Sequence, residues 1–285
     1  MKKSQIIGIG AAIIIGCAYV GTKMYASSIA EEKIDIAIAN LVNYVDVDYQ
    51  NVSVDLLGFA VHISDIVVSP TKSEDKIHID EIVIFDVDKD SDVPFFLHIA
   101  LNGIQIPIDQ IEAVKNLGYN DYMLLNADIE YDYNATAKEI VLNRLQVGAD
   151  GVGDIEISLR LSNIDLNPEN VLAFLLTYPQ IILHNGTMMY RDDSFIERLM
   201  RLQAETQDRD VTQMKDGMII VIEHAIEEEE DEFTKQALTE IRNFVNAPEK
   251  LLISIEPIKP LPLGRLMRTQ NPKELIKLLN IKIQS

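Results

Sequence analysis

The sequence predicts an α+β protein with an N-terminal transmembrane helix, a curved antiparallel β meander and a C-terminal α+β part that carries a helical insertion. Three observations predict this class: an apolar run near the N-terminus, a long stretch in which apolar and polar residues alternate, and helical apolar stripes toward the C-terminus. The predicted boundaries are 1–43 for the membrane anchor, 44–166 for a β-rich exported domain and 167–285 for the α+β part, with the insertion at 192–247.

The apolar run extends over 17 uncharged residues, from Ile6 to Thr22, which is at the short end of what one spanning helix needs. Lys2 and Lys3 precede it, so the positive-inside rule places the N-terminus in the cytoplasm and the bulk of the chain in the periplasm or another extracytoplasmic space. We therefore expect a single-pass protein of the inner (cytoplasmic) membrane. The expected membrane-anchor residues are Ile6, Ile9, Ile13, Ile14, Ile15 and Val20.

Three interpretations of this run compete. It fits an uncleaved signal anchor, a lipoprotein signal in which Cys17 receives the lipid, or a cleaved signal peptide with its site near residues 26–28. We favour the anchor because the chain stays apolar after Cys17 and then continues as an amphipathic helix. The apolar stripe of that helix is Ala30, Ile34, Ala37, Ile38, Leu41 and Val42.

Composition narrows the classes of partner. The net charge is −20 and the isoelectric point is about 4.5, whereas a nucleic-acid-binding protein needs a basic face. We therefore expect no nucleic-acid partner. Cys17 is the single cysteine of the chain, so the exported part is expected to fold without disulfides.

From residue 44 onward the spacing of apolar residues changes from helical to alternating, which predicts half-buried strands. The alternation slips by one residue at Ser64-Asp65 and again at Asp80-Glu81, and we interpret both slips as bulges. Asn102-Gly103 separates two alternating runs and predicts a hairpin turn. A short helix is expected over 110–117. Strands are expected within 45–56, 61–68, 77–84, 95–101, 104–108, 123–133, 139–147 and 154–161.

The C-terminal part is predicted to mix strands and helices. Strands are expected at 180–190, 251–255 and 281–283, with helices at 169–176 and from Pro272 onward. The insertion contains three helices, each with one apolar stripe that must be buried. We expect the insertion to pack as a cap on the C-terminal strands, with the acidic run Glu227–Glu232 as an exposed hinge at its tip.

No catalytic motif stands out, and no cofactor is expected. Oxygen ligands at every second position can hold calcium, and four aspartates follow that spacing: Asp86, Asp88, Asp90 and Asp92. A calcium hand requires Gly where Ser91 stands and Glu where Leu97 stands, so that motif fails. A solvated, charged strand end explains the aspartates as well.

The stretch from Val47 to Ile108 resembles the N-terminal part of the AsmA-like envelope proteins. The similar segments are Val52–Gly58, Val61–Val68 and Ile77–Ile84. The resemblance implies one membrane helix followed by a lipid-conducting β groove, a role in lipid homeostasis of the envelope, and no catalytic residue. The segment Tyr190–Ser194 is similar to small membrane-anchored bacterial proteins of unknown function.

Together these features predict a membrane-anchored, extracytoplasmic and non-enzymatic protein that binds lipid in the manner of the AsmA-like family. The alternative function is an accessory or scaffold subunit of a membrane complex. The expected partner is membrane lipid. Another membrane protein or a basic partner fits the alternative, because the surface is acidic.

Overall fold

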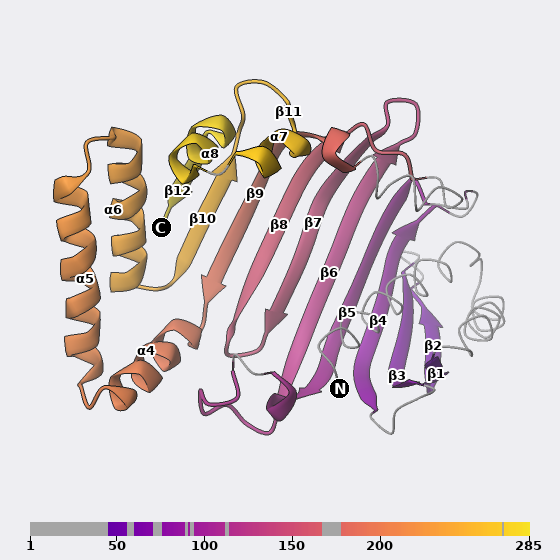
Figure 1. The fold of residues 1–285 in the computed structure, drawn as a ribbon. Helices are drawn as coiled ribbons and strands as arrows, with labels where there is room; N and C mark the ends of the chain where they lie inside the picture. The colour runs from indigo at the N-terminus through magenta and orange to yellow at the C-terminus, as the bar shows by residue number, and fades with distance from the viewer. Residues whose placement is uncertain are drawn as a thin grey trace.

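The structure is a computed structural model that describes residues 45–55, 60–70, 76–88, 91, 94–111, 114–166, 178–269 and 271–285. Within these residues the chain forms one antiparallel sheet of 12 strands, in the order β1-β3-β4-β5-β6-β7-β8-β9-β10-β12. Two short strands lie off this path, because β2 pairs with β3 and β11 pairs with β9. Figure 1 shows the sheet as one continuous layer.

The strands are β1 (Val45–Asp48), β2 (Asn51–Val54), β3 (Val61–Pro70), β4 (Ile77–Val87), β5 (Phe96–Pro107), β6 (Tyr122–Asn134), β7 (Glu139–Ala149), β8 (Gly153–Ser162), β9 (Ile182–Asp192), β10 (Lys250–Ile255), β11 (Leu261–Pro262) and β12 (Ile281–Gln284). The helices are η1 (Ile108–Gln110), η3 (Tyr178–Gln180), α4 (Phe195–Thr206), α5 (Val211–Glu228), α6 (Glu232–Asn246), α7 (Leu263–Arg268) and α8 (Pro272–Leu279).

One row of apolar side chains crosses the sheet from β3 to β12. Residues that face each other on neighbouring antiparallel strands point to the same side. The row is Val61, Ile84, Ile99, Ile129, Leu145, Ile157, Met188, Ile253 and Ile283. The face is therefore apolar from β3 to β12. Its burial is uneven, since Ile84 and Ile99 are 3% and 0% exposed whereas Ile129 and the later members of the row are only half-buried.

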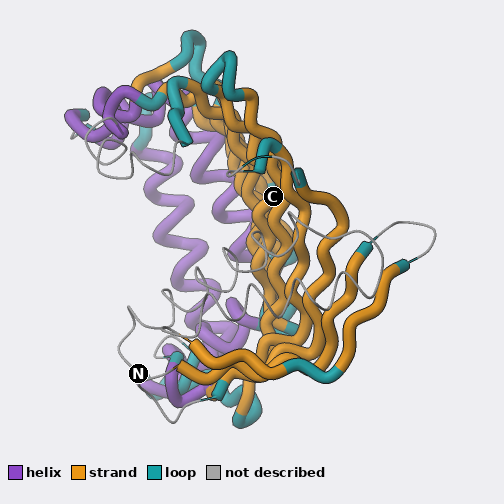
Figure 2. Tube along the Cα trace, turned by 90° about the vertical axis from the view of Figure 1, so that its right-hand side faces the viewer, coloured by secondary structure: helices purple, strands orange, loops and turns teal. Residues whose placement is uncertain are grey.

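The sheet is curved, and the helices lie on its concave side (Figure 2). The ring of Phe244 in α6 meets the ring of Tyr190 in β9 edge-on, with centroids 6.0 Å apart. Tyr190 belongs to the apolar face, because it pairs with Ile155 and Leu251. The apolar face is therefore the concave one.

The helical segment between β9 and β10 lies at one end of the sheet. Helix α6 packs beside β12, α5 packs on α6, and α4 leads from β9 to α5. Figure 1 shows α5 as the outermost of the three helices. The cap that the sequence predicts thus lies mainly at the β12 edge of the sheet, and α4 reaches the ends of the central strands β6 and β7.

The predicted fold class is wrong. The chain is mainly one 12-stranded antiparallel sheet, to which both the expected β meander and the expected C-terminal α+β part contribute strands. The pairing of β8 with β9 joins the two parts directly. Among the described residues no helix is both long and apolar enough to cross a membrane. No described helix corresponds to the expected N-terminal transmembrane helix, whose residues lie outside the described ones.

The predicted Asn102-Gly103 hairpin is also wrong, because β5 continues through both residues. Gly103 adopts a φ of +66°, and the register with β6 shifts between Leu101 and Ile104, as expected for a bulge with glycine in the left-handed region. A Cβ atom at Gly103 would collide with the carboxylate of Asp80. Glycine is therefore required here by close approach as well as by conformation.

The two phase slips in β3 and β4 are not bulges. They are one local change of backbone conformation that residues 64–65 of β3 and 80–81 of β4 share, here called the crease. The register between these strands is unbroken, since Ser64 pairs with Glu81 and Ile66 pairs with Ile79. Asp65, between them, has a left-handed φ of 55°. Both strands change phase at the same level, so the apolar side chains on either side of the crease stay on one face.

The uneven burial of the apolar face predicts uneven losses of stability. We expect Ile99→Ala to lower the free energy of unfolding by about 3 kcal/mol, because it leaves a cavity at a fully buried position. The same change at Ile155, which is 43% exposed, is expected to cost about 1 kcal/mol or less. Urea unfolding followed by circular dichroism measures both. Equal losses would show that the central strands are covered as tightly as β5.

Candidate functional site

The candidate site is the part of the apolar face that crosses β6 to β9, here called the open apolar face. Its members are Ile129, Leu145, Val147, Ile155, Ile157 and Met188. None of them is buried, and Val147 and Ile155, which face each other, are 45% and 43% exposed. Large apolar side chains that stay accessible in the middle of a sheet indicate a surface that receives something apolar.

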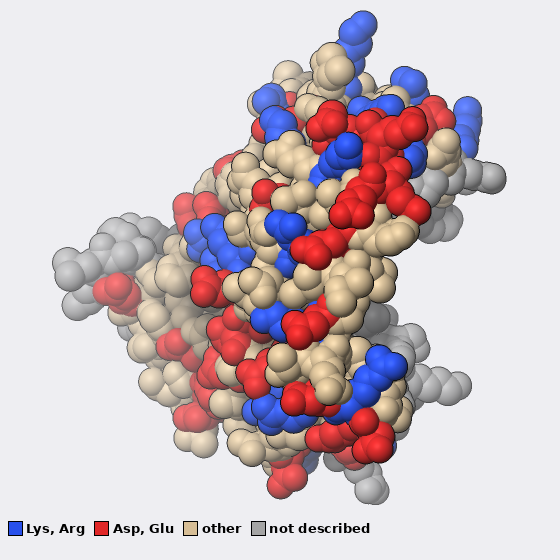
Figure 3. Space-filling model, turned by 90° about the vertical axis from the view of Figure 1, so that its left-hand side faces the viewer, with Lys and Arg blue, Asp and Glu red and all other residues tan. Residues whose placement is uncertain are grey.

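Helices border this face at two places. At one end of the strands, Phe195 and Leu199 of α4 pack against a cluster that includes Met123 and Ala149. At the β12 edge, α6 places Phe244 against Tyr190. Figure 3 shows the molecule hollowed on its concave side, between an upper and a lower part. The open apolar face is therefore the floor of a concavity.

Polar groups lie where β9 leads into α4, next to this floor. The hydroxyl of Tyr190 donates to Oδ1 of Asp192 at 2.5 Å, and the same oxygen accepts from the backbone N–H of Ile196. Burial and the hydrogen bond to Asp192 raise the pKa of Tyr190. The phenol is therefore neutral and cannot act as a base near neutral pH. Its role is to fix the start of α4 against β9.

The opposite, convex face is polar. Cross-strand ion pairs cover it, among them Arg191 with Asp154 and Arg160 with Glu139. A cavity of about 310 Å³ lies on β5 to β8 and is lined in part by Asp128, Asp154 and Asp193. Arg191 donates two hydrogen bonds to Asp154, at 2.6 and 2.8 Å. The Asp154 carboxylate is therefore already paired with Arg191. The lining of the cavity is largely polar, so it offers no apolar floor for a lipid.

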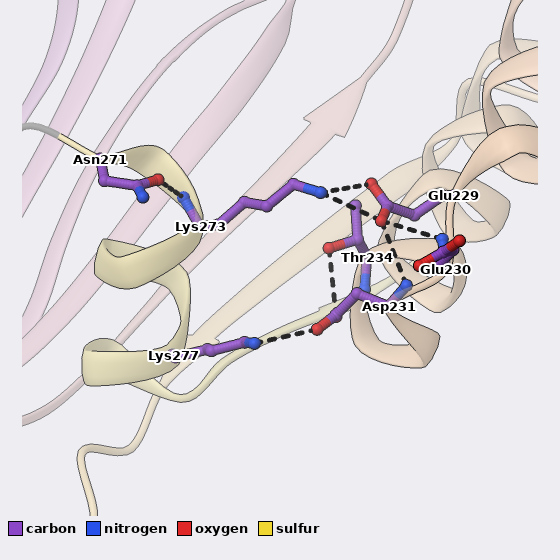
Figure 4. A network of polar contacts seen from close by, with 7 residues as sticks. All are labelled: Glu229, Glu230, Asp231, Thr234, Asn271, Lys273 and Lys277. Carbon is purple, nitrogen blue, oxygen red and sulfur yellow. Dashed lines mark hydrogen bonds and ion pairs between the residues drawn. The ribbon is translucent and has the colours of Figure 1, made fainter.

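The acidic hinge between α5 and α6 is tied to α8 (Figure 4). Lys273 contacts both carboxylate oxygens of Glu229 at 3.1 Å, and Lys277 contacts Asp231 at 3.1 Å. The Glu229 side chain is only 16% exposed. The expected exposed hinge is thus partly covered, and the two lysines hold the α5–α6 hairpin in place beside the sheet.

The hinge carboxylates are hydrogen-bonded in their charged form. Backbone N–H groups and Lys273 lower the pKa of Glu229 below its ordinary 4.5. The backbone N–H of Thr234 and the ammonium of Lys277 lower the pKa of Asp231 below 3.8. Both carboxylates therefore remain ionised, and the lysine contacts persist, at mildly acidic pH.

Most of the residues singled out by sequence lie outside the described ones. These are the anchor residues Ile6, Ile9, Ile13, Ile14, Ile15 and Val20, the candidate lipidation site Cys17, and the calcium candidates Asp90 and Asp92. Asp86 is exposed at the end of β4, and buried Asp88 accepts a hydrogen bond from the N–H of Phe95. Within the described ranges no group of three or more His, Cys, Asp or Glu is placed to hold a metal ion.

Sequence reasoning missed the continuity of the apolar face. Alternation gives the buried side of each strand, but it does not say which strands are neighbours. A bulge in β7, between Leu142 and Leu145, changes the alternation from even to odd residues and keeps both leucines on the apolar face. The spacing of three residues between Leu142 and Leu145, instead of two, is the local sequence signal of this bulge.

Comparison with known proteins adds a partial match. A protein-family profile that carries the description "Uncharacterized protein" matches residues 146–285, which include β8, β9, β10 and the helices between β9 and β12. The search of curated proteins finds no match for this chain. The profile description assigns no chemistry to the matched residues.

The hinge predicts a pH-dependent attachment of the α5–α6 hairpin. Carboxyl groups whose pKa is lower in the folded state contribute stability above their ordinary pKa and lose it as the pH falls through the lowered values. We expect hydrogen exchange in α5 and α6, corrected for the intrinsic rate, to accelerate as the pH falls below about 4.5.

The variant Lys273→Ala with Lys277→Ala removes the cations, so its hairpin should exchange faster already at pH 7 and depend less on pH. The control, Lys76→Ala with Lys115→Ala, removes two exposed lysines from another part of the molecule and should match the unchanged protein. Equal exchange in all three proteins would show that the two lysines do not hold the hairpin.

Proposed function

We propose that this protein is a non-enzymatic binding protein that holds the acyl part of a lipid on its open apolar face. The observation that carries the proposal is the exposed pair Val147 and Ile155, which face each other on β7 and β8 near the turn that joins these strands, on a concave, otherwise apolar sheet face. Ligand sites for apolar molecules are concave and lined mainly by hydrophobic side chains, and this surface has both properties.

The chemistry of the face supports binding rather than catalysis. Its six members carry only alkyl and thioether groups, which neither transfer protons nor stabilise developing charge. Tyr190 is the nearest titratable group described above, and its raised pKa keeps it neutral. The proposal therefore gives the surface one task, which is to remove an apolar chain from water. About 25 cal/mol is gained per Å² of apolar surface removed from water.

The proposed location follows from the sequence and from the kind of ligand. A lipid-binding surface is useful at or near a membrane, and the basic-then-apolar N-terminal segment is typical of export. We propose that residues 45–285 act outside the cytoplasm, at the inner membrane. A reporter enzyme that is active only after export, fused after Ser285, should be active; activity of a cytoplasm-specific reporter at the same position would contradict this location.

Lipid that co-purifies with the protein tests the proposed function. The variant Val147→Gln with Ile155→Gln places two amides on the open apolar face, at positions that are 45% and 43% exposed already. We expect it to retain the fold and to carry at least about tenfold less lipid, which corresponds to about 1.4 kcal/mol of lost affinity. Mass spectrometry of organic extracts from the purified proteins measures the lipid.

Val141→Gln is the matched control, because Val141 lies on β7 but faces the polar side, opposite Asp132 and Arg160. It makes the same exchange of valine for glutamine and should leave the bound lipid unchanged. The proposal is wrong if the unchanged protein carries no lipid above background, or if the control loses as much lipid as the double variant.

A second function, as an accessory or scaffold subunit of a membrane complex, is favoured by one observation. No residue of α5 is buried, and Ile220 and Val221 on its outer side are 64% and 69% exposed. A helix that is apolar on its outer side suits a protein partner. The two functions separate experimentally, since Ile220→Asp would release such a partner without changing the bound lipid.

A further inference from the structure

The loop that follows β10 and the helix α7 form one tip of the molecule, here called the basic tip (residues 256–268). Ile258 is 89% exposed and Met267 is 60% exposed, so both are among the most exposed large apolar side chains of the described residues. Figure 1 places the loop and α7 together at the upper end of the sheet. Two apolar side chains thus project from one end of the molecule.

The tip is held in a fixed shape. At its start, Nζ of Lys282 contacts the carboxylate of Glu256 at 2.6 Å, and Asn280 donates to the Glu256 carbonyl. Where the loop leads into α7, the N–H of Leu263 donates to the carbonyl of Ile181 at 2.8 Å. Pro257 and Pro260 flank Ile258 and Lys259 and restrict the backbone of the loop. The exposure of Ile258 is therefore built into the fold.

The tip also carries positive charge in a strongly acidic protein. Lys259, Arg265 and Arg268 are all exposed, and none of them forms an ion pair with another described residue. Residues 250–285 contain seven lysines and arginines against two glutamates, whereas the whole chain has a net charge of −20. Figure 3 shows blue side chains projecting from the upper end of the molecule.

We propose that the basic tip docks on the surface of an anionic phospholipid membrane. Exposed cations beside exposed apolar side chains suit such a surface, because the cations contact headgroup phosphates while the apolar groups enter the boundary of the acyl chains. Most of the remaining surface is acidic and is repelled by the same headgroups, so contact through the tip is favoured. An acidic protein is the competing partner for the three cations, and the experiments below separate it from a lipid surface.

Docking by the tip would also orient the site. Strand β11 in the tip pairs with the start of β9, through Leu261 with Leu183 and Pro262 with Ile182, and Leu183 is a member of the apolar face because it pairs with Leu161. The tip therefore lies at one end of that face. The docking surface itself does not depend on the proposed lipid binding, since its residues are separate from the open apolar face.

A fluorophore placed in the loop tests the docking directly. Cys17 is the single cysteine, so Cys17→Ser with Ile258→Cys in the full chain gives one labelling site. A polarity-sensitive label there should shift to shorter wavelength with vesicles of phosphatidylcholine and phosphatidylglycerol, and much less with phosphatidylcholine alone. The shift should weaken as salt rises. The same label at Ile220→Cys, on α5, should stay in water.

Charge variants complete the test. Lys259→Gln, Arg265→Gln and Arg268→Gln together should reduce the shift at least about fivefold at 0.1 M salt, where charges closer than about 10 Å still interact. The control, Lys76→Gln, Lys115→Gln and Arg209→Gln, changes the net charge equally at exposed positions elsewhere and should leave the shift intact. A label that stays in water with anionic vesicles, an equal loss in both triple variants, or a shift caused by polyglutamate but not by vesicles would overturn the proposal.

Discussion

Burial of one apolar sheet face is the interaction on which the rest of the structure depends. The row from Val61 to Ile283 crosses every strand on the main path from β3 to β12. An apolar face of this kind must be covered by other parts of the chain or by a bound molecule. On β3 to β5 it is covered, and Ile99 is completely buried. From β6 to β9 it is only half-buried. The same pattern thus supplies the core at one end of the sheet and the candidate site in the middle.

The polar features act in support of that face. Arg191 with Asp154 and the other cross-strand pairs keep the convex side solvated and so make the two sides of the sheet unequal. The Gly103 bulge and the crease at Asp65 bend β3 to β5 while preserving the phase of the apolar side chains. Lys273 and Lys277 hold the α5–α6 hairpin beside β12 through the hinge carboxylates. Each feature shapes the concavity or its border.

Local sequence signals predicted most elements, because period and capping are local properties. The alternation marked β6, β7 and β8, and Asn271 caps α8 through the N–H of Lys273 as its position before Pro272 predicts. Pairing of strands far apart in sequence has no such signal, so the single sheet and its open apolar face were missed. The exposed side of helix α5 could not be predicted from the sequence either. Its run from Met218 to Ile222 is apolar on all sides, so the apolar stripe of this helix did not reveal which side is exposed.

The central claim is that a lipid chain lies against Val147 and Ile155. Methyl-resolved NMR with a fatty acid that carries a nitroxide on its acyl chain tests this contact most directly, because the nitroxide broadens methyl signals near it. The account predicts strong broadening at the Val147 and Ile155 methyl groups and little at Val141, which faces the other side of β7. Equal broadening at all three positions, or none at Val147 and Ile155, would contradict it.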